Sequence, residues 1–163
     1  MRNNSISRFS IRRWWQNLGF GIESKSDYTY LHEVLRESLP YYAYDDLLLR
    51  HPSATPQEHR IARLLFRMCN AERSKHIRLL GNYSELEKDA IETATGVDFN
   101  SQDRAKHIHN ADIIIVKNIL ADNQEIWQSI LNQRHVITFD MVCIGFALFD
   151  IKRYSEHYHI SHP

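Results

Sequence analysis

The sequence predicts a three-layer α/β domain with a mostly parallel sheet of about five strands, preceded by a helical N-terminal extension. The first observation is that helical segments alternate with short apolar runs from residue 56 onward, which is typical of a parallel sheet with helices on both faces. The second is that the last two apolar runs almost touch, which predicts a C-terminal antiparallel hairpin. We therefore expect an extension over residues 1–56, packed on an α/β domain over residues 57–163.

The extension is predicted to hold a basic aromatic segment and two helices. Its first 22 residues carry four arginines and no acidic residue, with Trp14 and Trp15 beside them. These arginines could contact a membrane surface or a nucleic acid, but four charges attract phosphate only weakly in salt. We expect the tryptophans to pack on the domain while the arginines stay in water. Apolar residues at helical spacing predict helices over residues 27–38 and 41–47.

The helices of the domain are predicted from amphipathic spacing and from their caps. Ser84 is followed three residues later by Glu87, which is the pattern of a capping box at the start of a helix. The predicted helices cover residues 56–70, 84–95, 101–109 and 124–133.

The strands are predicted from short apolar runs rich in β-branched residues. Ile113 to Val116 is an unbroken run of this kind, which is typical of a strand buried on both faces. The histidine-rich residues after the hairpin, including His157 and His159, are expected to form a frayed tail. The predicted strands cover residues 76–80, 96–99, 113–116, 136–142 and 144–149.

The composition limits the classes of function. Lys and Arg number 20, as do Asp and Glu, so no global basic charge points to a dedicated nucleic-acid binder. No apolar window approaches the length of about 18 residues that a membrane span needs, and the N-terminus lacks the apolar core of a signal peptide. Cys69 and Cys143 each lie in an apolar run, which suits reduced thiols. We expect a cytoplasmic protein.

Histidine pairs are the candidates for a metal site. His107 with His109, and His157 with His159 and His162, bring rings together in sequence. They have no cysteine partner and no pair at the spacing of a helix turn, so we expect no metal site. The sequence also has no nucleophile elbow, phosphate-binding loop or complete dinucleotide fingerprint, and we expect no catalytic residue.

Short motifs at both ends of the chain carry a resemblance to a known family. They are FGIESKSDY at 20–28, LPYYAY at 39–44, RLLFRM at 63–68, WQSI at 127–130, VITFD at 136–140, GFALF at 145–149 and a tail from Lys152 to Tyr158. In this order they resemble a bacterial family of class I S-adenosylmethionine-dependent methyltransferases, whose members open with a stretch like HGIHSPF and continue with a YYxY segment. The resemblance implies a Rossmann-like, methyltransferase-type sheet.

The departures from the family pattern fall where the cofactor would bind. The resemblance implies an acid and a glycine-rich turn after the first strand, but this chain has Arg78 and keeps only Gly81. Glu85 and Glu87 stand where small glycines would admit the methionine moiety, and they would place negative charge beside its carboxylate. Two acids after a later strand are replaced by Lys117-Asn118. Asp98 remains as a candidate for binding the ribose hydroxyls.

The chain therefore resembles a shortened, degenerate methyltransferase. Residues 61–163 leave room for about five strands, not the seven of the complete family sheet, at about 30 residues for each βαβ unit. We expect a non-catalytic methyltransferase-like protein that binds no cofactor and acts as a binding or assembly subunit, with an unknown protein partner or a second copy. Gly81 and Asp98 are then vestigial cofactor-binding residues. The alternatives are an S-adenosylmethionine-dependent methyltransferase, or another nucleotide-binding enzyme, with an atypical cofactor site, and a peripheral binding module that uses the basic N-terminus.

Overall fold

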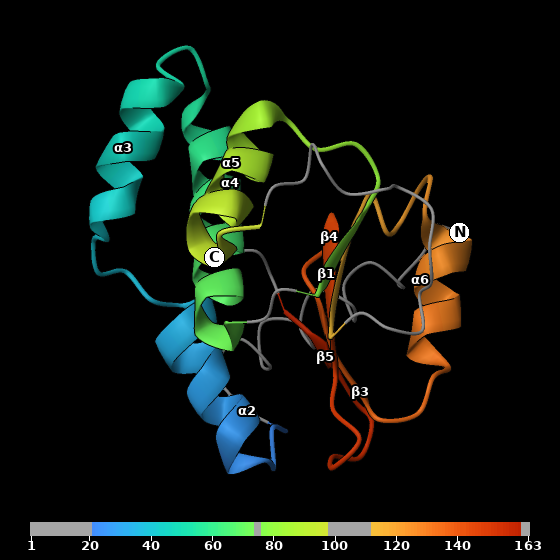
Figure 1. Ribbon diagram of the computed structural model, residues 1–163. Coiled ribbons are helices and arrows are strands. Elements are labelled where there is room, and N and C mark those ends of the chain that lie inside the picture. The colour runs from blue at the N-terminus through green and yellow to red at the C-terminus, as the bar shows by residue number, and fades with distance from the viewer. Residues whose placement is uncertain (1–20, 74–75, 98–111, 161–163) are drawn as a thin grey trace, which may run out of the picture.

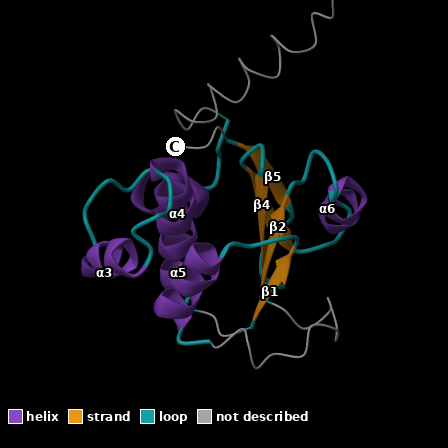
Figure 2. Ribbon diagram, turned by 90° about the horizontal axis from the view of Figure 1, so that it is seen from above, coloured by secondary structure: helices purple, strands orange, loops and turns teal. Residues whose placement is uncertain are grey.

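The computed structural model describes residues 21–73, 76–97 and 112–160, and within them an α/β fold in three layers (Figure 1). The sheet is the middle layer, with α4 and α5 on one face and α6 on the other, and α3 lies outside α4 and α5 (Figure 2). The helices are α2 (Lys25–Tyr30), which runs on into a π-helical turn η1 (Leu31–Leu35), α3 (Tyr42–Arg50), α4 (Pro56–Glu72), α5 (Glu85–Thr95) and α6 (Gln124–Leu131). The strands are β1 (Ile77–Leu80), β2 (Ile113–Lys117), β3 (Val136–Asp140), β4 (Ile144–Phe149) and β5 (Glu156–His159).

The five-stranded sheet is mixed, with the order β1-β2-β4-β3-β5. The β1–β2 and β3–β5 pairs are parallel, whereas β4 is antiparallel to both of its neighbours, β2 and β3. The predicted antiparallel hairpin is confirmed, but the prediction of a mostly parallel sheet is wrong. The physical reason is that β4, the second strand of the hairpin, lies between β2 and β3. Both of its pairings are therefore antiparallel.

Two further predictions about strands need correction. The segment expected to be a frayed tail forms β5, because Tyr158 is buried against the sheet while the strand pairs with β3. The strand expected over 96–99 is not seen in its described part, since Gly96 ends α5 in the left-handed conformation and Val97 follows outside any strand. Residues 98–99, the helix expected over 101–109, and Trp14 and Trp15 lie outside the described residues.

Strand β2 is buried on both faces, as its sequence predicts. Ile113 and Ile115 belong to the larger core cluster, with side chains of α4, η1, β3 and β4. Ile114 and Val116 point the other way and pack with Trp127 and Ile130 of α6. A strand with two apolar faces needs helices on both sides, so this short run of sequence accounts for the three layers.

The described part of the N-terminal extension is bound to the α/β layers through buried polar contacts. Asp27, in the first turn of α2, has 2% of its surface exposed, forms an ion pair with Arg153, and accepts a hydrogen bond of 2.8 Å from the Tyr158 hydroxyl of β5. The Arg67 guanidinium of α4 donates to the backbone carbonyls of Val34 and Leu35 at 2.8 and 3.1 Å. These carbonyls lie in η1, so α4 supplies donors to an irregular helical turn.

Gly145 of β4 gives the first testable prediction. A Cβ atom at this position would lie 2.5 Å from Cζ3 of the Trp127 ring, and β4 is held between β2 and β3 and cannot move aside. Gly145→Ala is therefore expected to lower the free energy of unfolding by about 2–3 kcal/mol, measured by chemical denaturation. The control is Gly96→Ala, where the new atom meets nothing within 4 Å and only the positive φ of 69° opposes it, at about 1 kcal/mol. An unchanged denaturation midpoint for Gly145→Ala would contradict the packing of α6 on the sheet.

Candidate functional site

The candidate site lies at the carboxyl ends of the parallel strands β1 and β2, which end at Leu80 and Lys117. We call this end of the sheet the carboxyl edge. Open α/β sheets bind ligands outside the carboxyl ends of their strands, and the turn that the resemblance suggests as a vestigial cofactor site follows β1 here. The structure brings together at this edge Gly81, Tyr83, Glu87 and Lys117. Asp98, the second predicted cofactor-binding residue, lies outside the described residues.

Gly81 is needed here for reasons of space and backbone conformation. Its φ is +107°, and a Cβ atom would lie 3.1 Å from both the Lys117 Cβ and the Asn123 Nδ2. Asn123 Nδ2 donates at 2.7 Å to the Lys117 carbonyl oxygen, which holds the segment after β2 close to the turn after β1. The close approach that Gly81 permits is therefore between two parts of this chain.

The N-terminus of α5 is capped by its own side chains. The Glu87 Oε2 accepts from the Ser84 backbone N–H at 2.8 Å, and the Ser84 hydroxyl accepts from the Glu87 N–H at 3.3 Å, as the predicted capping box requires. A helix N-terminus binds anionic groups through free N–H groups. At the start of α5, the N–H groups of Ser84 and Glu87 are already hydrogen-bonded to side chains of the cap.

Lys117, at the end of β2, and Glu87, in the first turn of α5, form an ion pair. The Lys117 Nζ donates to Glu87 Oε1 and Oε2 at 2.9 and 2.8 Å, and Glu87 is only 2% exposed. The ammonium group also lies 5.4 Å from the centre of the Tyr83 ring, and the Tyr83 hydroxyl donates at 2.8 Å to the Ile115 carbonyl. Burial raises the pKa of Tyr83 well above its usual value, with a further contribution from Glu87, so this phenol stays protonated.

These contacts change the electrostatic argument drawn from the sequence. Glu87 is neutralised by Lys117 and is not a free negative charge facing a ligand. Glu85 is exposed and pairs with Lys88 on the same helix. Lys117, which stands where the resembled family has an acid, thus pairs with Glu87 on α5, and residue spacing alone does not reveal this pair. Asn118, the other replaced position, adopts a positive φ of 55° and is exposed.

The described histidines at this edge bond to neighbouring strands. His159 Nδ1 lies 3.0 Å from an Asp140 carboxylate oxygen, and His157 Nδ1 lies 2.9 Å from the Thr138 hydroxyl. Burial lowers the pKa of His157. In residues 21–73, 76–97 and 112–160, no group of three or more His, Cys, Asp or Glu side chains is placed to hold a metal ion. His107, His109 and His162 lie outside those ranges.

The two cysteines occupy different environments. Cys69 is buried in the core on α4, and burial raises its pKa to about 12, so its thiol is protonated and inert as a nucleophile. Cys143 lies in the turn between β3 and β4, where the predicted strand bounds place it, but it is exposed and is not the core thiol that its apolar neighbours suggest.

The sequence does not reveal a group of polar residues at the opposite end of the strands, where β2 begins. Asp27, Glu72, Asp150 and Arg153 line a cavity there, although they come from three separate segments: α2, the end of α4 and the turn after β4. No single motif joins them, so only the fold brings them together.

Comparison with known proteins gives no match: neither a family model, nor a curated protein, nor a solved structure is similar to this chain. Among the described helices, none combines the length and the apolar character needed to cross a membrane.

The buried ion pair gives the second prediction. Lys117→Met would leave the Glu87 carboxylate buried without its cation, so we expect it to cost about 3 kcal/mol of unfolding free energy. The matched control is Lys88→Met, which breaks a pair with an exposed glutamate and should cost about 0.5 kcal/mol or less. Lys117→Met combined with Glu87→Gln should recover part of the loss, because no charge is then stranded. Equal denaturation midpoints for the two lysine variants would contradict the buried pair.

Proposed function

We propose that this chain is a non-catalytic, methyltransferase-like protein that acts as a binding or assembly subunit. The single observation that carries the proposal is the Lys117–Glu87 ion pair, which lies with Tyr83 at the edge where a Rossmann-like sheet would hold its cofactor. The family resemblance of the sequence supplies the methyltransferase half of the proposal. A parallel pair of strands followed by a closing antiparallel hairpin is compatible with it.

The ion pair makes ligand entry at this edge unfavourable. A ligand that took the place of Lys117 would leave Glu87, which is almost fully buried, without its counter-charge. A ligand that took the place of Glu87 would also remove the cap of α5. Both costs reduce the binding free energy before the ligand makes any contact of its own.

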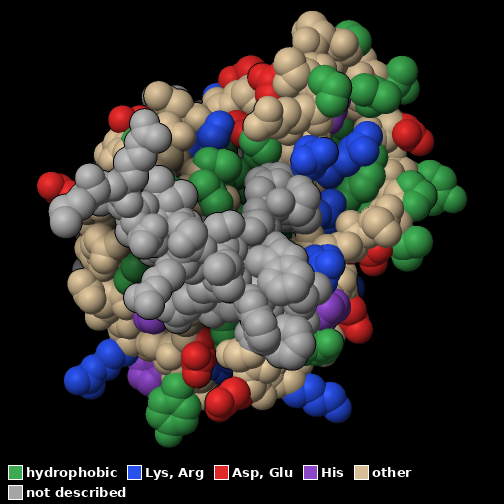
Figure 3. All heavy atoms as spheres, turned by 180° about the vertical axis from the view of Figure 1, so that it is seen from behind, with side chains coloured by type: hydrophobic (Ala, Val, Ile, Leu, Met, Phe, Trp, Pro, Cys, Tyr) green, Lys and Arg blue, Asp and Glu red, His purple; other side chains and the backbone are tan. Residues whose placement is uncertain are grey.

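The surface of α3 supports a role in binding another protein. Tyr42 and Leu49 lie seven residues apart on one face of this helix and are 95% and 77% exposed. Leu48, next to them, and Leu39, just before the helix, are exposed as well. Hydrophobic side chains gather on the side of the molecule that α3 forms (Figure 3). Groups of exposed apolar side chains of this kind mark interaction surfaces.

A cofactor titration tests the proposal and gives the third prediction. Full-length protein titrated with S-adenosylmethionine in a calorimeter should show no binding isotherm up to about 1 mM, because the Lys117–Glu87 pair would have to break. A parallel titration with ATP covers the alternative of another nucleotide, and we expect the same result. A dissociation constant below about 100 μM for either compound would overturn the non-catalytic assignment and favour an enzyme with an atypical cofactor site.

A further inference from the structure

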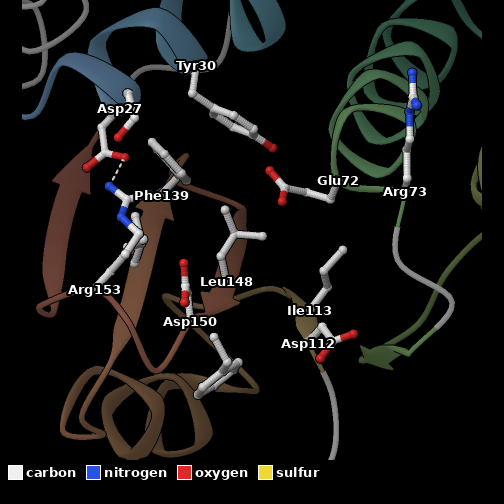
Figure 4. Close-up of a pocket in the computed structure, with 13 residues that line it drawn as sticks. Asp27, Tyr30, Glu72, Arg73, Asp112, Ile113, Phe139, Leu148, Asp150 and Arg153 are labelled. Carbon is white, nitrogen blue, oxygen red and sulfur yellow. Dashed lines mark hydrogen bonds and ion pairs between the residues drawn. The ribbon is translucent and has the colours of Figure 1, made fainter.

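A cavity of about 530 Å³ lies at the opposite end of the strands, which we call the amino edge, where β2 begins and β4 ends. Its apolar floor is formed by the partly exposed Leu148 and Phe149, with Ile113 and Phe139 fully buried behind them, and α2 and the end of α4 form its walls (Figure 4). The volume falls within the range of about 300–1,000 Å³ that is usual for small-molecule sites. Neither Lys117 nor Glu87 lines this cavity, which lies at the opposite end of the strands from their ion pair.

Charged groups of the cavity wall are predominantly acidic. Four carboxyl groups and two guanidinium groups line it: Asp27, Glu72, Asp112 and Asp150 against Arg73 and Arg153. The Arg153 guanidinium is bound by Asp27, and the Arg73 side chain points along α4 and away from the cavity (Figure 4). Among the described residues that line the cavity, the charge that remains is therefore negative.

Glu72 is the central acidic group. It is half-buried at the end of α4, and no described cation lies within ion-pair distance of its carboxyl group. Burial raises its pKa, although the nearby Tyr30 hydroxyl and the charge of Arg153 oppose the shift. Asp150, which faces the same space, accepts a hydrogen bond only from the Lys152 backbone N–H among the side-chain contacts described.

Tyr30 supplies a second and independent sign of a ligand. Its hydroxyl is buried and points toward the Glu72 carboxyl group (Figure 4), but it has no partner at full hydrogen-bond geometry among the described residues. A buried hydroxyl without such a partner is costly, and a ligand donor or acceptor at this point would relieve that cost. The Tyr30 ring stacks on Phe139 with their centres 5.1 Å apart, which gives an aromatic wall beside the carboxylates.

We propose that this cavity binds a small organic cation, with a primary ammonium group held by Glu72 and Asp150 and an apolar body lying against Tyr30 and Leu148. Ammonium groups are attracted both by carboxylates and by the faces of aromatic rings. An organic cation fits better than a metal ion, because the carboxyl groups of the described residues do not converge on a metal position. The apolar floor also matches an organic body and not a hydrated ion.

The test uses the full-length protein and the probe 2-phenylethylammonium, with amide chemical shifts and calorimetry as readouts. We expect saturable binding that shifts amides of Tyr30, Ile113 and Leu148. The neutral 2-phenylethanol and the anionic 3-phenylpropionate have similar bodies without the positive charge. They should bind at least about tenfold more weakly, which is the scale of one hydrogen bond to a charged group.

Variants assign the site to its residues. Glu72→Gln and Asp150→Asn should each weaken binding of the ammonium probe by about tenfold, and the matched control Glu85→Gln, exposed at the other edge, should leave it unchanged. Both test variants keep the shape of the side chain, and melting curves of each will show that it is folded. Equal binding of the three probes, unchanged affinity in both variants, or no saturable shifts at about 10 mM probe would overturn the proposal.

Discussion

The buried carboxylate of Asp27 is the interaction on which the arrangement of the extension depends. A carboxylate removed from water costs several kcal/mol unless it is fully paired, and here Arg153 and the Tyr158 hydroxyl provide that pairing. Tyr158 lies 131 residues further along the chain, on the edge strand β5. The contact therefore fixes α2 beside the last strand and places Leu31 and Leu35 of the following turn in the main core cluster. It also forms one wall of the cavity at the amino end of β2.

The sequence predicts those parts of the fold that are encoded locally. Ile113 to Val116 is a buried strand because apolar side chains point to both faces, and Ser84 and Glu87 cap α5 because they are three residues apart. Strand β5 was missed because three of its four residues are charged or histidine, and only Tyr158 is buried. The place of β4 between β2 and β3 was missed for a different reason. Hydrophobic alternation specifies that a strand forms, but it does not specify the strand with which it pairs.

The candidate site is less predictable than the fold, because its chemistry arises between elements. The sequence identifies Gly81 as a turn residue and Lys117 as a replaced acid. Neither observation reveals that Lys117 reaches Glu87, which lies 30 residues away, or that Gly81 faces Asn123. Compared singly with the motif of the resembled family, Lys117 and Glu87 each look like the loss of a functional residue. In the structure they form one ion pair. The same limit explains why the cavity residues, which come from α2, α4 and the ends of β2 and β4, have no sequence signature.

The two edges of the sheet differ in how completely their polar groups are satisfied. At the carboxyl edge, Lys117 neutralises Glu87, and the N–H groups of Ser84 and Glu87 at the start of α5 are capped, so a ligand gains little by entering. At the amino edge, the half-buried Glu72 carboxyl group lies beside a buried Tyr30 hydroxyl that has no hydrogen-bond partner in the described part of the chain. Buried polar groups are normally paired, and unpaired ones lower stability. Among the described residues, the Tyr30 hydroxyl is thus an unpaired buried group on the cavity wall, where an incoming cation would satisfy it. At the carboxyl edge, Lys117 and Glu87 instead pair with each other.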